Sequence, residues 1–132
     1  PKLTESMLGM MLLHDIVSSA TQAHLPTIDK LWGIRIKHNL DRAEFVRFSQ
    51  NKDFTSSNPS IVSSFYRLPG GKLFAVLVNR SKTDQTSHVS FGASYQSAFE
   101  EWEGKALPLA NDALDITIPG RMFRIVVLMG RK

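Results

Sequence analysis

The stretch that decides the fold is IVSSFYRLPGGKLFAVLVN, residues 61–79. It holds two strand-sized apolar runs on either side of Pro69-Gly70-Gly71-Lys72. Because glycine adopts positive φ without steric cost, this tetrapeptide favours a tight turn between two antiparallel strands. The stretch therefore predicts a β-hairpin.

Four more strand-like segments follow the hairpin, and turn signals separate them. They are TSHVSF (86–91), AFEEW (98–102), ALDITI (113–118) and MFRIVVLM (122–129). Such regular spacing of short strands favours an antiparallel sandwich or barrel. We predict an antiparallel β-sandwich of six to seven strands over residues 56–132.

The first part of the chain has a helical pattern instead. TESMLGMMLLHDIV, residues 4–17, contains good helix formers, and Thr4 or Ser6 can cap the free amides at its start. The segment is apolar nearly all round, which predicts a helix that is buried on several sides.

Two further helices are expected before the strands begin. One starts near Pro26, which is tolerated in a first helical turn, with Thr27 as its cap. The other covers DRAEFVRF, residues 41–48, with Asp41 as a candidate cap. We therefore assign residues 1–55 to a helical segment, and the whole chain to the α+β class.

The composition excludes several classes of protein. The chain has 132 residues, 42% of them apolar, and a mild formal charge of +4 that is not gathered into basic stripes. Nucleic-acid binders concentrate Lys and Arg in such stripes, and a membrane span needs about 20 consecutive apolar residues. We expect no nucleic acid and no membrane as partners. Without cysteine, disulfides and thiolate chemistry are excluded.

Three glutamates surround a tryptophan in AFEEWEGKAL, residues 98–107. On a strand, Glu101 and Glu103 share one face and lie about 6.5–7 Å apart along the backbone, a spacing found between glycosidase carboxylates. A glycosidase also needs its two acids on opposite sides of a bound sugar, with the pKa of one of them raised by burial. Adjacent acids beside a glycine turn are typical of a solvated strand edge, and this is the interpretation we adopt. Trp102 has two interpretations, a sugar-stacking ring or a core residue, and the core is the commoner place for a tryptophan.

No other pattern assembles a catalytic site. His14 and Asp15 are neighbours on a helix, where side chains point about 100° apart and pair badly. The remaining histidines are scattered, so neither a metal nor a cofactor is expected. Asn79 begins an Asn-Arg-Ser triplet with the spacing of a glycosylation acceptor, although this triplet is frequent by chance. We predict no catalytic residue in this chain.

Several stretches together resemble the end of a family of large bacterial glycosidases. They are LLHDIV (12–17), IDKLWGIRIKHNLDRAEFVRF (28–48), IVSSFYRLPGGKLFAVLVNRSKTDQTSHVSF (61–91), AFEEWEGKAL (98–107) and LDITIPGRMFRIVVL (114–128). AFEEWEGKAL is similar to the family segment A-x-D-x-W-x-G-K-x-L, with Glu100 or Glu101 near the usual acid. These enzymes are glycoside hydrolases of the α-amylase and α-galactosidase type, in which a catalytic (β/α)8 barrel precedes a C-terminal β-sandwich.

The resemblance implies a non-catalytic C-terminal domain of a multidomain glycoside hydrolase. Its partner would be the catalytic barrel of the same parent chain, which the helices would contact and stabilise. Residues 1–55 would then be the end of that barrel or its linker. Isolated, the chain would tend to self-associate through apolar helix surface. The compartment stays open, and a periplasmic or extracellular parent fits the resemblance.

Two other functions remain as alternatives. A carbohydrate-binding module would use Trp102, Tyr66 and Tyr95 as stacking surfaces for a polysaccharide, which requires at least two of these rings to be coplanar and exposed on one face. A small hydrolase in its own right would use Glu101 and would lose its activity on Glu101→Gln.

Overall fold

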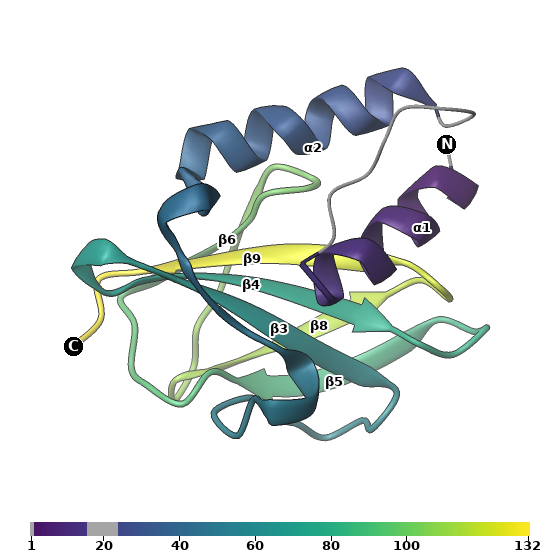
Figure 1. Ribbon diagram of the computed structural model, residues 1–132. Helices are drawn as coiled ribbons and strands as arrows, with labels where there is room; N and C mark the ends of the chain where they lie inside the picture. Colours follow the sequence, from purple (N-terminus) through teal and green to yellow (C-terminus); the bar gives the residue numbers. More distant parts are fainter. Residues whose placement is uncertain (1, 16–23) are drawn as a thin grey trace.

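The computed structural model describes residues 2–15 and 24–132 of the chain. Within these residues, two helices come first and antiparallel strands follow (Figure 1). The helices are α1 (Lys2–Leu13) and α2 (Leu25–His38), and the short 3-10 helices are η1 (Leu40–Arg42), η2 (Phe48–Gln50) and η3 (Pro69–Gly71). The strands are β1 (Glu44–Val46), β2 (Thr55–Ser56), β3 (Ile61–Leu68), β4 (Lys72–Asn79), β5 (Gln85–Ser90), β6 (Ser97–Glu100), β7 (Lys105–Leu107), β8 (Ala113–Ile118) and β9 (Phe123–Met129).

The strands form two antiparallel sheets that pack face to face. The larger has the order β1-β3-β4-β9-β6-β7, and the smaller has the order β2-β5-β8. In Figure 1 both helices lie over one face of the larger sheet, and β5 and β8 lie beneath its other face. The molecule is therefore built in three layers, and the predicted α+β class, with helices followed by antiparallel sheets, is confirmed.

The predicted hairpin is present as β3 and β4. The two strands pair over their whole length, from Ile61 opposite Asn79 to Leu68 opposite Lys72. Gly70 and Gly71 make the connection with φ values of 78° and 74°. This is the left-handed conformation for which glycine is favoured, so the hairpin prediction is confirmed.

The larger sheet is the middle layer and is buried on both faces. On β4, Phe74, Val76 and Val78 belong to the core beneath the helices. The alternate residues, represented by Leu73 and Leu77, belong to the core between the two sheets. Because side chains alternate across a strand, two-sided burial explains why β4 reads as an unbroken apolar run.

The helices pack closely on this sheet. Leu8, Leu12 and Leu13 of α1 are at most 1% exposed. At Gly9 a methyl group would lie 3.0 Å from the Phe123 side chain, so the glycine lets α1 lie close to β9. The helical core therefore belongs to the same packed unit as the sheet.

The helix predicted over residues 41–48 is wrong. The chain forms only a single 3-10 turn at its start and then the strand β1, whose Phe45 lies opposite Tyr66 of β3. This pairing depends on a distant partner strand, which local sequence does not show. Residues 44–46 thus join the sheet although they lie inside the segment 1–55 that we assigned to helices.

The helix starts also differ from the prediction. The first helix begins at Lys2, before both candidate caps, and the end predicted for it at residues 16–17 lies outside the described residues. The second is preceded by His24 in an extended conformation, with no side-chain cap. Instead of capping the helix, the Thr27 hydroxyl lies 2.8 Å from His24 Nδ1.

Seven strands, β3 to β9, lie between Ile61 and Met129 in the described chain, within the predicted six to seven. The boundary we predicted between residues 55 and 56 falls inside β2.

Candidate functional site

The helices carry an exposed apolar surface, which we call the outer helix surface. Its residues are Leu3, Met7, Met10, Leu25, Trp32 and Ile36. Leu3 is 86% exposed and Ile36 76%. Positions three, four or seven apart lie on one side of a helix, so each helix has an outward stripe opposite its buried one. Among the large apolar residues that the structure describes as exposed, only Met129 lies elsewhere.

A shallow hollow beside Trp32 belongs to this surface. It measures about 160 Å³ and is lined by Trp32, Arg35, Ile36, Asn39 and Asp41. The Arg35 guanidinium lies 5.9 Å from the Trp32 ring centroid and 3.9 Å from an Asp41 oxygen. An exposed tryptophan held beside an arginine is the kind of residue pair that anchors protein interfaces.

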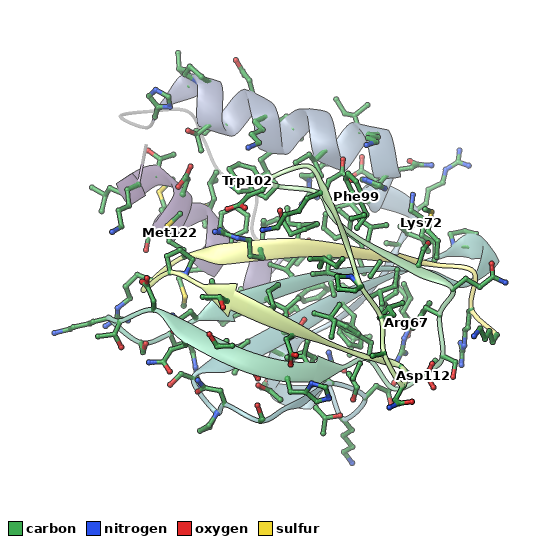
Figure 2. The ribbon with its side chains drawn as sticks, turned by 180° about the vertical axis from the view of Figure 1, so that it is seen from behind. Arg67, Lys72, Phe99, Trp102, Asp112 and Met122 are labelled. Carbon is green, nitrogen blue, oxygen red and sulfur yellow. The ribbon has the colours of Figure 1, made fainter. Side chains whose placement is uncertain are left out.

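The turn between β6 and β7 holds α2 in place. Lys37 Nζ donates a 2.6 Å hydrogen bond to Glu101 Oε1. Lys30 Nζ lies 4.1 Å from the Trp102 ring centroid, a cation–π contact. Figure 2 shows Trp102 between α2 and the strands. The residues of this turn therefore attach α2 to the larger sheet.

Glu101 is not solvated as the sequence predicted, because its side chain is only 8% exposed. His38 Nε2 lies 3.3 Å from Glu101 Oε2, without hydrogen-bond geometry, and His38 Nδ1 is also buried without a partner among the described residues. Burial lowers the pKa of His38 below its usual value, and the positive charge of Lys72 adds to this effect. Although burial alone would raise the pKa of Glu101, the Lys37 ammonium and the His38 ring hold it below the usual value.

Glu100 is the buried acid that sequence reasoning missed. It is 1% exposed, and its carboxylate accepts hydrogen bonds from the backbone amides of Trp102 (3.0 Å), Glu103 (2.5 Å) and Ile125 (3.1 Å). Glu100 ends β6, and its carboxylate folds the chain back on itself. The available signal was an acid placed just before a glycine turn, where side-chain oxygens bond to backbone amides two or three residues on.

The three predicted stacking rings are all buried and do not share a face. Trp102 is 5% exposed, Tyr66 2% and Tyr95 8%. Trp102 and Tyr66 belong to the core beneath the helices, and Tyr95 belongs to the core between the sheets. Burial raises the pKa of Tyr66, and its hydroxyl donates a 2.8 Å hydrogen bond to Asp15. These rings offer no common surface to a sugar, although Tyr95 lines a hollow.

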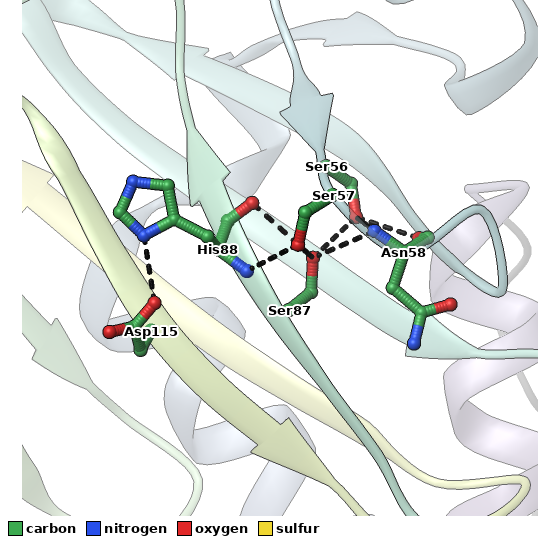
Figure 3. A network of polar contacts seen from close by, with 6 residues as sticks. All are labelled: Ser56, Ser57, Asn58, Ser87, His88 and Asp115. Atoms are coloured by element: carbon green, nitrogen blue, oxygen red, sulfur yellow. Dashed lines mark hydrogen bonds and ion pairs between the residues drawn. The ribbon is translucent and has the colours of Figure 1, made fainter.

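Serine, histidine and aspartate meet on the smaller sheet, but not as a catalytic triad (Figure 3). His88 Nδ1 lies 2.7 Å from Asp115 Oδ1, with both side chains exposed. The Ser57 hydroxyl accepts a hydrogen bond from the backbone amide of His88, not from its ring, and lies 3.3 Å from the Ser87 hydroxyl. A catalytic serine needs its hydroxyl in contact with the histidine ring, and here it is not. The network instead attaches the loop after β2 to β5.

The other residues that the sequence pointed to, His14, Asp15 and Asn79, make packing contacts and hydrogen bonds within the fold. The His14 ring packs edge-on against Phe48 at 5.4 Å, while Asp15 bonds to Tyr66. Asn79 is fully buried, and its side-chain amide donates to the carbonyl oxygens of Thr83 and Ile118. In the folded chain this amide cannot accept a glycan.

Residues 2–15 and 24–132 hold neither a cluster of metal ligands nor a membrane-spanning helix. No three His, Asp or Glu side chains gather there in a way that would hold a metal ion. The helices in this part of the chain are too short or too polar to cross a membrane.

No protein-family model matches the chain, and no curated protein matches it in sequence. Among solved structures, an Anoxybacillus α-amylase is similar in fold, with a TM-score of 0.62 and 12% identity over 85% of this chain and 24% of the amylase chain. A GH30 endoxylanase from Clostridium papyrosolvens has a TM-score of 0.48 and 14% identity, covering 56% of this chain and 21% of its own. A Bacteroides fragilis protein assigned as an α-galactosidase or melibiase has a TM-score of 0.47 and 12% identity, covering 54% and 16%.

These structural neighbours are glycoside hydrolases, and this chain spans about a quarter of their length or less. At 12% identity, the likeness to the α-amylase establishes the fold alone.

Proposed function

We propose that this chain is a non-catalytic accessory domain of a glycoside hydrolase, and that it packs against the catalytic barrel and stabilises it. The observation that carries the proposal is the outer helix surface, because six of the seven large apolar side chains described as exposed lie on these two helices. The α-amylase likeness supports it, since the shared fold occupies only 24% of that enzyme's chain.

The surroundings of the acids support a non-catalytic role. The Glu100 carboxylate accepts hydrogen bonds from three backbone amides, and the Glu101 carboxylate accepts one from Lys37. Glu103 pairs with Arg124 at 2.6 Å. A glycosidase needs two carboxylates that flank an open sugar site, and these three are instead engaged in holding a turn.

The partner that we propose for the outer helix surface is the barrel of the same parent chain. Trp32 and its hollow would form the centre of the contact, with Ile36 beside them and the stripe of α1 toward the rim. Interfaces of this kind concentrate their binding energy in a few buried aromatic and arginine anchors. Arg35, already held near Asp41, is placed to serve as such an anchor.

The test produces the barrel of the parent protein and this chain as separate polypeptides. We expect the two to co-elute and the barrel to melt at a higher temperature when this chain is present. Ile36→Asp should weaken the complex at least ten-fold, because it places a charge in an apolar contact. The matched control is Met129→Asp, which adds the same charge at an exposed apolar position outside the helices. A barrel that is unaffected by this chain would refute the stabilising role.

Two measurements on the isolated chain complete the test. Light scattering should show self-association that Ile36→Asp reduces, whereas a monodisperse monomer with fully protected α1 amides would count against an uncovered surface. Turnover of aryl glycosides that is lost on Glu101→Gln would establish a hydrolase and overturn the non-catalytic assignment.

A further inference from the structure

Two adjoining hollows open at the end of the sandwich where β3 turns into β4. The first measures about 270 Å³ and is lined by Asp53, Phe65, Arg67, Leu73, Phe91, Gly92, Ala93, Tyr95 and Arg131. The second measures about 340 Å³ and is lined by Ser90, Gly92, Ala93, Ser94, Asn111 and Asp112. They share Gly92 and Ala93 and therefore adjoin, and we call the two together the groove. Figure 2 shows Arg67 and Asp112 at the same end of the molecule.

The walls of this groove are fixed in place. Gly92 has a φ of 75°, and a methyl group there would lie 2.6 Å from the Asp53 side chain, so only glycine lets the loop close against Asp53. Asp53 in turn pairs with Arg67. The Ser94 hydroxyl donates a 2.7 Å hydrogen bond to Asp112. A groove whose polar groups are held before binding loses little conformational entropy when a ligand enters.

The polar groups on the rim determine which ligand would fit. Phe65 and Phe91 are at most 2% exposed, so they form the floor and offer no stacking face. The Tyr95 hydroxyl makes no hydrogen bond to a described residue. Burial raises the pKa of Tyr95, and the nearby positive charges of Arg131 and Arg67 oppose that rise. The hydroxyl is therefore available as both donor and acceptor.

The charges on the rim cancel. Two guanidinium groups, Arg67 and Arg131, stand against two carboxylates, Asp53 and Asp112. An anion would be repelled by both carboxylates, and a cation would be repelled by both guanidinium groups. A neutral ligand with many hydroxyl groups is repelled by neither, because each hydroxyl can donate to a carboxylate and accept from an arginine.

We propose that this groove binds a neutral polyhydroxylated ligand, namely a short stretch of oligosaccharide, through Tyr95, Arg131 and the loop Gly92–Ser94. The proposal does not depend on docking to a barrel, since the groove and the outer helix surface have no residue in common. It also gives Tyr95 a different role from ring stacking, because here the hydroxyl and not the ring face meets the sugar.

The experiment titrates the isotopically labelled 132-residue chain with maltotriose, with xylotriose and with inorganic phosphate, and follows the backbone amides by NMR. At least one saccharide should shift the amides of residues 92–94 and 111–112 with saturation in the millimolar range, and phosphate should not. Tyr95→Phe and Arg131→Ala should each weaken binding about five-fold, as expected for one lost hydrogen bond. Arg42→Ala, at another exposed arginine, is the matched control and should change nothing.

Three results would overturn the proposal. The first is that neither saccharide shifts the groove amides. The second is that the shifts occur on other elements, and the third is that phosphate alone binds in the groove. Loss of barrel docking in the experiments above would leave these titrations unchanged, so the two proposals fail separately.

Discussion

Replacing Glu100 by glutamine should destabilise the fold far more than an isosteric exchange on the surface. The carboxylate accepts three backbone hydrogen bonds, two on Oε1 and one on Oε2. Glutamine keeps one acceptor oxygen, so in either orientation at least one buried amide faces a donor. An unsatisfied buried donor costs about 1–3 kcal/mol, and each remaining bond loses about 1 kcal/mol without the charge. We expect a total loss of about 3–5 kcal/mol, from one unsatisfied donor and two weakened bonds.

The loss is measured by chemical denaturation at neutral pH, with the slope of the transition unchanged. For a chain of this size it corresponds to a drop in melting temperature of roughly 15 °C. Glu44→Gln is the control, because this exposed acid makes only a 3.9 Å ion pair with Arg67. It should cost less than about 0.5 kcal/mol. If Glu100→Gln and Glu44→Gln are equally mild, the carboxylate does not hold the turn.

The remaining predictions concern pH and two glycines. Because the folded pKa of His38 is lowered, the unfolded chain binds more protons below pH 6.5, and stability should fall as pH decreases from there toward 4.5. Below pH 4.5 the lowered pKa of Glu101 adds a further loss as that carboxylate protonates. Denaturation measured across this range should show that the free energy of unfolding declines less between pH 6.5 and 4.5 in His38→Leu than in the unchanged chain. An identical decline in both would contradict the role given to His38. Gly33→Ala should raise stability by about 0.5–1 kcal/mol, because this helical position has open space around it. Gly120→Ala should cost more than about 2 kcal/mol, because its methyl would lie 2.2 Å from the Lys82 carbonyl oxygen, and equal melting temperatures for the two variants would refute this contrast.

The sequence was most informative where the signal is local. Gly70 and Gly71 specify a hairpin by themselves, because few other residues accept their backbone angles. The strand β1 escaped prediction for the opposite reason, since Phe45 becomes a strand residue only when Tyr66 lies opposite it. Three-residue strands of this kind are defined by their partner and not by their own pattern.

The acids of the β6–β7 turn show why their environments could not be predicted. Strand alternation placed Glu101 in water on the assumption that the strand continues to Glu103. The strand instead ends at Glu100, whose carboxylate bends the chain and brings Glu101 to Lys37. A residue 64 positions away therefore determines the environment of Glu101. Likewise, the groove with Tyr95 exists only because loop residues and Arg131, which follows β9, come together beside β3 and β4, and no single stretch encodes it.

The two-sided burial of the larger sheet determines where this chain can be divided. Cutting it near residue 55, where the sequence suggested a boundary, would strip the cover from Tyr66, Phe74 and Phe123, each at most 2% exposed. The remaining strands would expose these aromatic side chains to solvent and would be prone to aggregate. For grafting onto another protein, the smallest portable piece is thus the helices and both sheets together.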